Sequence, residues 1–550
     1  MTVPITAKWE DIASAKRAAR DALIPEEWRI PDTAERNVIN VPKKCGVLTP
    51  KELEITETEA SVLVDRMIGG QLTSYEVTLA FCKRAAIAQQ LTNCLTEIFF
   101  DAALLTAQAI DKTFASTGTP VGPLHGLPVS LKDNFYVEGV DTTVGFVGWA
   151  NDAAPKEKES EMTKIMRQCG AVLFCKTNVP TAMMMAETYN NTWNYTTNPY
   201  NRDCSSGGSS GGESALLALK GSPLGVGTDI GGSIRIPASF CGLYSLKPSF
   251  GRFATYGARS GLPGQEAIRS INGPMSSSLS AVQLWSKAVV DTGKPWTVDP
   301  NMLPIPWREV EVPEKLCFGM ILDNGIVKPT PPVTRALLET KKALEAAGHT
   351  VIEWCPYNPA EAGELMMNFF LGDGGVKIAQ YLALSGEPYP AGMGSYKERF
   401  ETHKANPPMV GSLWDTQSAR TSYCKKVLDD WLSTKEITGT GRPFDALLSP
   451  VTAYSACPKY AFDFHVTYTS MWNITDYSCT TLPVTYVDPA KDVKGPFEGR
   501  SELEQRIWDR YDPKEVEGAP VSIQVVCGRL EEEKVLKITG VVDAALKSAQ

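Results

Sequence analysis

Apolar residues recur at the spacing of an amphipathic helix along two stretches early in the chain, 57–70 and 73–91. At the start of each stretch, a threonine is followed three positions later by a glutamate, which is the pattern of a helix N-terminal capping box. These pairs are Thr56 with Glu59, and Thr73 with Glu76. The pattern predicts two helices that begin close to these threonines.

Further along, helical spacing alternates with short apolar runs rich in β-branched residues. Residues 158–177 predict a helix that ends at Gly170 and is followed by a buried strand, and residues 333–354 predict the same order around Gly348. Helices that alternate with buried strands are typical of layered α/β proteins. We therefore expect an α/β fold with a mixed, mostly parallel central sheet covered by helices on both faces.

Strand-like runs return near the C-terminus, at 444–453 and 518–528, and we expect them to complete the same sheet. The whole chain, residues 1–550, is therefore predicted to form a single large domain. Three regions are distinguished within it: an N-terminal helical extension at 1–50, a motif-bearing core at 120–255, and an excursion between the two halves of the sheet at 293–440. The excursion opens with a proline-containing stretch.

The composition limits the class of function. With 43% apolar residues, a net charge of −9 and a pI near 5.3, the chain can form a buried core but offers no basic surface to a phosphate backbone. No stretch reaches the roughly 18 apolar residues that cross a membrane, and the N-terminus lacks the apolar region of a secretory signal. We expect a cytoplasmic protein that binds neither nucleic acid nor membrane.

Cysteines and histidines give no sign of a metal centre. The thirteen cysteines include no CxxC pair, and four that lie within apolar runs are expected to be buried thiols: Cys82, Cys175, Cys241 and Cys527. The chain has only four histidines and no HExxH motif. We therefore expect neither a metal nor another cofactor.

Two glycine-flanked serines stand close together in the sequence, Ser209 in GGSSGG and Ser233 in DIGGSIR. The first loop lacks the GxxxxGK[ST] pattern of a phosphate-binding loop, and GVGTDIGG lacks the third glycine of the dinucleotide-binding fingerprint. Glycines before Ser233 allow successive backbone N–H groups to converge on one point, as an oxyanion hole requires. The two loops indicate that both hydroxyls are presented to one small reaction site.

Two kinds of base could activate such a serine. A GxSxG match centred on Ser209 or Ser210 would suit the nucleophile elbow of a Ser-His-Asp hydrolase, but a turn-rich stretch precedes it where a strand is expected. Lys132, which ends the apolar run GLPVSLK, is the alternative base. A free lysine has a pKa near 10.4, so burial without a carboxylate partner would have to lower it by about 3 units. Asp133 should face the opposite side of the strand and leave Lys132 unpaired.

The chain resembles the amidase signature family in a long gapless segment, GGSSGGESALLALKGSPLGVGTDIGGSIRIPASFCGLYSLKP. Three outlying segments match the family in order, so that the resemblance covers nearly the whole chain: PLHGLPVSLKDNF, GAVLFCKTNVP and GAPVSIQVVCGRLEEEKVL. Within the family, VTLAFCKRAAIAQQLTNC, AGHTVIEWCPY and LWDT are most similar to fungal acetamidases and general amidases.

The resemblance implies a Ser–cis-Ser–Lys triad in which every position is matched. Ser233 would be the nucleophile, Ser209 the bridging residue after a cis bond from Gly208, and Lys132 the base. The implied oxyanion hole consists of four backbone N–H groups, those of Ile230, Gly231, Gly232 and Ser233. Met183 matches a position that lines the acyl pocket in relatives, and Ser209 would also contact the substrate.

Neighbouring polar residues are expected to support these roles. Asp229 and Arg235 flank the nucleophile loop and should hydrogen-bond it into shape, while Ser210 should bond within the glycine loop. Glu213 should cap the following helix with its negative charge. His125 is expected to be a structural hydrogen-bonding residue.

The resemblance implies hydrolysis of the C–N bond of small, acetamide-like amides to a carboxylate and ammonia or an amine, through an acyl-enzyme on Ser233. Carbamates such as urethanes, anilides and esters are alternative substrates of the same chemistry. A glutaminase subunit of a tRNA-dependent amidotransferase and a non-catalytic binding protein are the competing identities. The expected partners are the amide, water and a second copy of the chain in a homodimer.

Overall fold

An 11-stranded mixed sheet forms the centre of the computed structural model, which describes residues 7–549. The strands are, in spatial order, β1 (Leu95–Ile98), β3 (Val172–Thr177), β2 (Pro128–Lys132), β6 (Gly225–Asp229), β8 (Ile271–Ser276), β7 (Tyr244–Lys247), β12 (Cys479–Tyr486), β13 (Pro520–Val526), β11 (Ala446–Pro450), β9 (Cys317–Met320) and β10 (Thr350–Glu353). A separate two-stranded sheet pairs β4 (Thr197–Asn198) with β5 (Asn201–Ser205).

The mixed character of the main sheet is confirmed by its strand pairs. β2 is parallel to β3 and β6, and β9 is parallel to β10 and β11. The other neighbours pair antiparallel. Parallel pairing, expected for most of the sheet, is limited to these two blocks because the strands between them run in alternating directions.

Helices surround the sheet. They are α1 (Trp9–Ala22), α2 (Val41–Lys44), α3 (Pro50–Glu57), α4 (Ala60–Ile68), α5 (Ser74–Thr92), α6 (Phe100–Thr117), α7 (Glu161–Gln168), α8 (Gly211–Ala218), α9 (Arg235–Phe240), α10 (Leu279–Asp291), α11 (Pro331–Ala346), α12 (Pro359–Phe370), α13 (Val376–Leu382), α14 (Gly394–His403), α15 (Val410–Ser433), α16 (Thr467–Ile474), α17 (Glu502–Arg510) and α18 (Glu532–Ala549). Within residues 7–549, none is both long and apolar enough to cross a bilayer.

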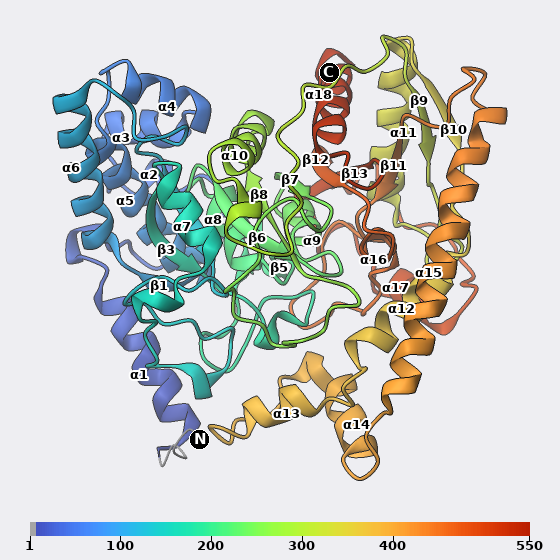
Figure 1. Ribbon diagram of the computed structural model, residues 1–550, viewed down its shortest axis with the longest axis horizontal. Coiled ribbons are helices and arrows are strands. Elements are labelled where there is room, and N and C mark those ends of the chain that lie inside the picture. The colour runs from blue at the N-terminus through green and yellow to red at the C-terminus, as the bar shows by residue number, and fades with distance from the viewer. Residues whose placement is uncertain (1–6, 550) are drawn as a thin grey trace.

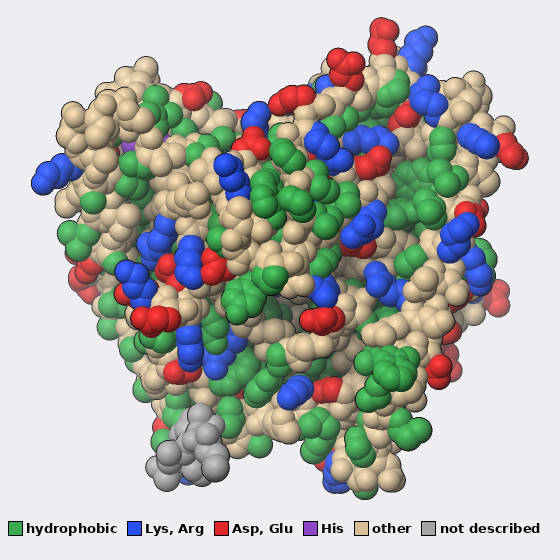
Figure 2. Space-filling view, in the orientation of Figure 1, with side chains coloured by type: hydrophobic (Ala, Val, Ile, Leu, Met, Phe, Trp, Pro, Cys, Tyr) green, Lys and Arg blue, Asp and Glu red, His purple; other side chains and the backbone are tan. Residues whose placement is uncertain are grey.

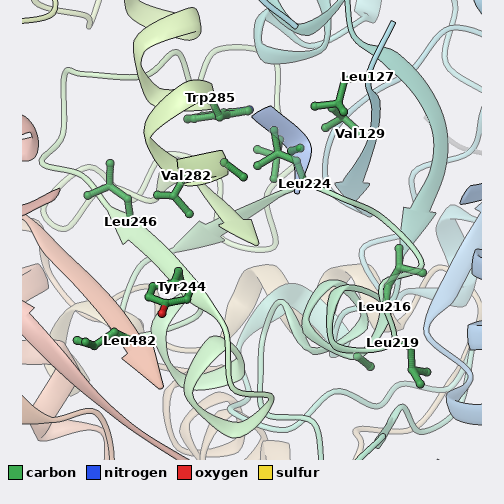
Figure 3. Packing of buried hydrophobic residues seen from close by; sticks show 14 of the residues in the cluster. Leu127, Val129, Leu216, Leu219, Leu224, Tyr244, Leu246, Val282, Trp285 and Leu482 are labelled. Atoms are coloured by element: carbon green, nitrogen blue, oxygen red, sulfur yellow. The ribbon is translucent and has the colours of Figure 1, made fainter. Parts of the chain in front are cut away.

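Two groups of helices contact the same central strands. The first group is α8 and α9, which pack against each other, and α9 contacts β7, β12 and β13. The second group is α10, α11 and α18, in which α18 contacts both other helices. The members of this second group also contact β7, β12 and β13. We conclude that helices cover both faces, as expected (Figure 1). Figure 3 shows buried side chains of the core between these layers, among them Trp285 of α10 and Leu246 of β7.

The predicted helix starts are correct in one case and wrong in the other. α5 follows a capping box in which Thr73 Oγ1 accepts from Glu76 N at 3.1 Å. The second box is formed by Thr49 with Glu52 ahead of α3, and not by Thr56 with Glu59. Thr56 lies within α3, because the Thr49–Pro50 pair starts that helix earlier and proline suits its first position.

The helix–strand orders around Gly170 and Gly348 are confirmed by α7 with β3 and by α11 with β10. The late strand-like runs are confirmed as β11 and β13. The segment 293–440 is not wholly an excursion, because it supplies β9 and β10 to one edge of the sheet before it continues as α12 to α15 (Figure 1).

The expected N-terminal extension contains α1 and α2 within its described part, residues 7–50. Cys82, Cys175, Cys241 and Cys527 are free thiols with no exposed surface, as predicted.

Candidate active site

Lys132 is the last residue of β2, and its side chain is completely buried. Its Nζ lies 2.8 Å from Ser209 Oγ, 2.7 Å from Thr228 Oγ1 and 3.3 Å from the Thr228 carbonyl oxygen. Burial lowers the pKa of Lys132 to about 7, although the more distant carboxylates of Asp229 and Glu213 oppose the shift. A pKa near 7 predicts that a large fraction of the Lys132 amines are neutral at neutral pH.

Asp133 does not pair with Lys132, as the alternation of side chains along a strand predicts. Its carboxylate lies 3.1 Å from Lys176 Nζ and accepts hydrogen bonds from Thr96 Oγ1, from Thr143 N and Oγ1, and from Val144 N. Lys176 of β3 is as buried as Lys132. The two lysines differ in that, among residues 7–549, only Lys176 has a carboxylate partner.

Ser209 belongs to a tightly packed glycine loop. The Gly208–Ser209 peptide bond is cis, and Ser209 is almost fully buried. A Cβ atom at Gly208 would lie 2.8 Å from the Met185 carbonyl oxygen, so no larger residue fits there. The backbone N–H of Ser210 donates to the Ser233 carbonyl oxygen at 3.1 Å and so joins the two glycine loops.

Ser233 lies between β6 and α9 and is partly exposed. In the part of the chain that the structure describes, its Oγ has no hydrogen-bond partner. The contact expected between Ser209 and Ser233 hydroxyls is therefore not formed, because Ser209 is turned toward Lys132 while Ser233 faces a pocket.

Three of the four N–H groups predicted for an oxyanion hole are free among residues 7–549: those of Ile230, Gly231 and Ser233. The fourth requires a correction. The N–H of Gly232 donates to Asp229 Oδ1 at 2.8 Å and is not available to a ligand. Gly232 has φ +135°, and a Cβ there would lie 2.5 Å from Thr469 Oγ1, so this position also requires glycine.

A buried ion pair holds the Ser233 loop. Asp229 accepts from the N–H groups of Gly232 and Ile234, and both of its oxygens accept from the Arg235 guanidinium at 3.1 Å. Burial alone would raise the pKa of Asp229, but the charge of Arg235 holds it well below its usual range. Arg235 thus acts on the loop through Asp229 rather than through the loop backbone.

Residues from distant parts of the sequence complete this network. Asn473 donates to Asp229 Oδ1 at 2.8 Å, Arg235 donates to Gln524 Oε1 at 3.1 Å, and Thr469 donates to the Gly231 carbonyl oxygen at 2.7 Å. The sequence gives no local signal for these contacts or for that of Thr228 with Lys132.

Ser233 opens onto an apolar pocket of about 330 Å³. Its other lining residues are Met183, Met184, Met185, Ala186, Gly208, Ile230, Gly231, Ile236, Phe370, Phe464 and Val466. Met183 is therefore at the pocket, whereas the aromatic residues Phe370 and Phe464 lie in segments that carry no recognisable motif. Such a lining suits a short hydrocarbon group next to the Ser233 hydroxyl.

The hydrogen bonds of three other candidate residues indicate structural roles. Ser210 lies within 3.4 Å of the Thr228 backbone. Glu213 makes no capping bond; its carboxylate accepts hydrogen bonds from Ser130 and Thr177, and burial raises its pKa to about 7. His125 accepts a hydrogen bond from Val121 N.

A nucleophile elbow needs a histidine hydrogen-bonded to its serine. None of the hydrogen bonds within residues 7–549 joins a histidine to Ser209, Ser210 or Ser233. In the same range, no three His, Cys, Asp or Glu side chains are grouped so as to hold a metal ion.

Comparisons with known proteins agree over most of the chain. The family described as Amidase matches residues 76–536. The acetamidase of Emericella nidulans is 41% identical over 540 residues, which cover 96% of this chain and 97% of that protein. The acetamidase of Aspergillus oryzae is 39% identical over 553 residues, which cover 98% of this chain and 99% of that protein.

A solved structure titled "Fatty acid amide hydrolase" has the same fold. It superimposes with a TM-score of 0.91 at 32% sequence identity, covering 98% of this chain and 95% of that one.

Proposed function

The chain belongs to the amidase family and is an amide hydrolase, and we propose that its hydrolytic chemistry runs through Lys132, Ser209 and Ser233. The observation that carries this proposal is the position of Lys132 Nζ, buried without a carboxylate partner and 2.8 Å from Ser209 Oγ. A neutral amine there can donate its two N–H groups to the oxygens of Thr228 and accept the hydroxyl proton of Ser209.

In the proposed first step, Ser233 turns its hydroxyl toward Ser209 and attacks the amide carbonyl carbon. The Ser233 proton passes to Ser209, and the Ser209 proton passes to Lys132. The carbonyl oxygen becomes an oxyanion within reach of the free N–H groups of Ile230, Gly231 and Ser233.

In the second step, the proton returns along the relay to the leaving nitrogen and the C–N bond breaks. Ammonia or an amine departs and leaves an ester on Ser233. Water then attacks this ester: its hydroxyl joins the acyl carbon and its other proton passes through Ser209 to Lys132. The bond between the acyl carbon and Ser233 Oγ breaks, the proton returns along the relay to Ser233, and a carboxylic acid is released. Asp229 and Arg235 support the site by fixing the loop that carries the donors.

We propose small aliphatic amides of the acetamide type as substrates. The apolar pocket beside Ser233 suits a short acyl group, and two relatives that share about two fifths of their residues with this chain are named acetamidases. Urethanes, anilides and esters remain alternatives because they form the same oxyanion. An amidotransferase subunit is less favoured.

The proposal also includes a cytoplasmic enzyme that works as a homodimer and needs neither nucleic acid nor membrane. The net charge of −9 disfavours a phosphate backbone as partner. On the face in Figure 2, cationic and anionic side chains are interspersed instead of being gathered by sign.

A substrate panel tests the proposed function. We expect the purified chain alone to release acid and ammonia from acetamide and butanamide, with kcat/KM at least about tenfold above that for hexadecanamide, since the apolar pocket beside Ser233 suits a short acyl group. Acetanilide, which carries the same acetyl group, and ethyl carbamate test the alternative leaving groups. Ammonia release and acid formation are measured together, with and without EDTA, which should have no effect. No turnover without a partner chain would favour the amidotransferase alternative.

A further inference from the structure

A second pocket with different chemistry adjoins the apolar one. It is open, has a volume of about 990 Å³, and is lined mainly by the segment 255–270 together with Asn134, Met183 and Phe250. Met183 lines both pockets, so the two are neighbours. Asn134 follows the proposed base Lys132 by two residues.

This pocket contains a buried acceptor without a donor. Asn134 is only 3% exposed, and its Oδ1 makes no hydrogen bond to any residue that the structure describes. Its backbone is fixed, because the Asn134 carbonyl oxygen accepts from Arg259 N at 2.8 Å. Buried amide oxygens in proteins are nearly always paired, so this one favours a ligand that brings an N–H or O–H group.

The same pocket contains an incompletely paired cation. The Arg259 side chain is 14% exposed, and its guanidinium stacks 3.8 Å from the Trp149 ring centre and donates to the Thr142 carbonyl oxygen. Among residues 7–549, the one carboxylate within 4 Å of the guanidinium is that of exposed Asp152, at 3.8 Å. Burial lowers the pKa of Arg259, in keeping with a charge that is poorly compensated.

A second guanidinium lines the pocket. Arg269 lies 4.5 Å from the Phe250 ring centre and donates to Asn301 and to Glu266. The pocket thus offers two guanidinium groups, one of them paired with the carboxylate of Glu266. This arrangement suits an anion far better than it suits a hydrocarbon group.

We infer that this pocket binds the amine half of the substrate and favours amines that carry a carboxylate, as in an N-acyl amino acid. The inference rests on the proposed function, in which the acyl half occupies the apolar pocket beside Ser233. Arg259 binds the carboxylate and Asn134 Oδ1 accepts an N–H group of the same half. When the C–N bond breaks, the nitrogen takes the relayed proton and leaves as the free amino acid, while water supplies the hydroxyl of the released acid.

The test compares N-acetyl-β-alanine with N-acetyl-3-methylbutylamine, which has a similar shape and no charge. We expect wild-type kcat/KM to favour the anionic substrate by about tenfold, because a charge-assisted hydrogen bond is made to one of them only. Arg259→Met should reduce this ratio to about one, and Arg259→Lys should restore part of it. Hydrolysis of acetamide, which does not reach Arg259, should be unchanged in both variants.

A second variant keeps the test independent of the packing of Arg259 on Trp149. Glu266 has a side chain that is 71% exposed, so Glu266→Gln should fold normally and raise the anionic preference two- to threefold by freeing Arg269, about the effect of one exposed charge pair. A wild-type ratio near or below one, or a ratio left unchanged by Arg259→Met, would overturn the inference. If the wild-type chain did not hydrolyse acetamide, the proposed function would be overturned instead.

Discussion

Replacing Lys132 with methionine should lower kcat/KM for acetamide by about 10³- to 10⁴-fold, because the variant has no base to accept the Ser209 proton. The free energy of unfolding should not fall. Burial holds the pKa of Lys132 near 7, far below the value of an unfolded lysine, so folding must neutralise this amine at every pH between the two values. Methionine removes that requirement. Steady-state kinetics and urea unfolding at pH 7 measure the two effects.

Lys176→Met is the matched control, since Lys176 is equally buried on the neighbouring strand. Here we expect the opposite pattern. The free energy of unfolding should be lower by about 3–5 kcal/mol, because the buried Asp133 carboxylate loses its cationic partner. The activity per folded molecule should be largely kept. If Lys132→Met kept its activity while replacement of His349, His403 or His465 abolished turnover, the nucleophile-elbow mechanism would be correct instead.

Replacing Ser233 with alanine should reduce kcat by at least about 10⁴-fold, because it removes the hydroxyl on which the proposed acyl-enzyme forms. A fluorophosphonate probe should label the wild-type chain once, at Ser233, and should not label the Ser233→Ala variant. Intact-mass and peptide mass spectrometry identify the labelled residue. Ser233 is partly exposed and makes no side-chain hydrogen bond within residues 7–549, so the substitution should leave stability almost unchanged.

Ser209→Ala is the companion variant, because it removes the relay and keeps the nucleophile. It should be labelled slowly at Ser233, whereas Ser210→Ala should be labelled at nearly the wild-type rate. Labelling at Ser209 or Ser210 in the wild type would contradict the assignment of Ser233, and a chain that no probe labels would favour a non-catalytic binding protein.

Much of the site can be predicted from the sequence because its parts are local. Lys132 ends an apolar strand, and Ser209 and Ser233 stand in glycine-rich loops whose conformations leave little choice of residue. The buried strands β11 and β13 are likewise visible as apolar runs. A short segment that strongly prefers one local conformation keeps that conformation in the folded protein.

The failures have a physical reason, which is competition between hydrogen-bond partners that no motif identifies. Gly232 N–H is taken by the carboxylate of Asp229, three residues earlier, and the same oxygen accepts from Asn473, more than two hundred residues later in the chain. Glu213 has the sequence context of a helix cap, yet burial against Ser130 and Thr177 gives it other partners. The pocket-lining side chains Phe370 and Phe464 come from segments with no motif at all.

The central claim is that the buried Lys132 amine is neutral in a large fraction of molecules at neutral pH, and an NMR titration of protein labelled with [ε-¹³C]lysine measures this directly. The Lys132→Met spectrum assigns the signal. We predict that the Lys132 resonance titrates with a pKa of about 7, so that the amine is protonated below this pH and a free base above it. A Lys132 resonance that remained that of an ammonium group up to pH 10 would contradict the account.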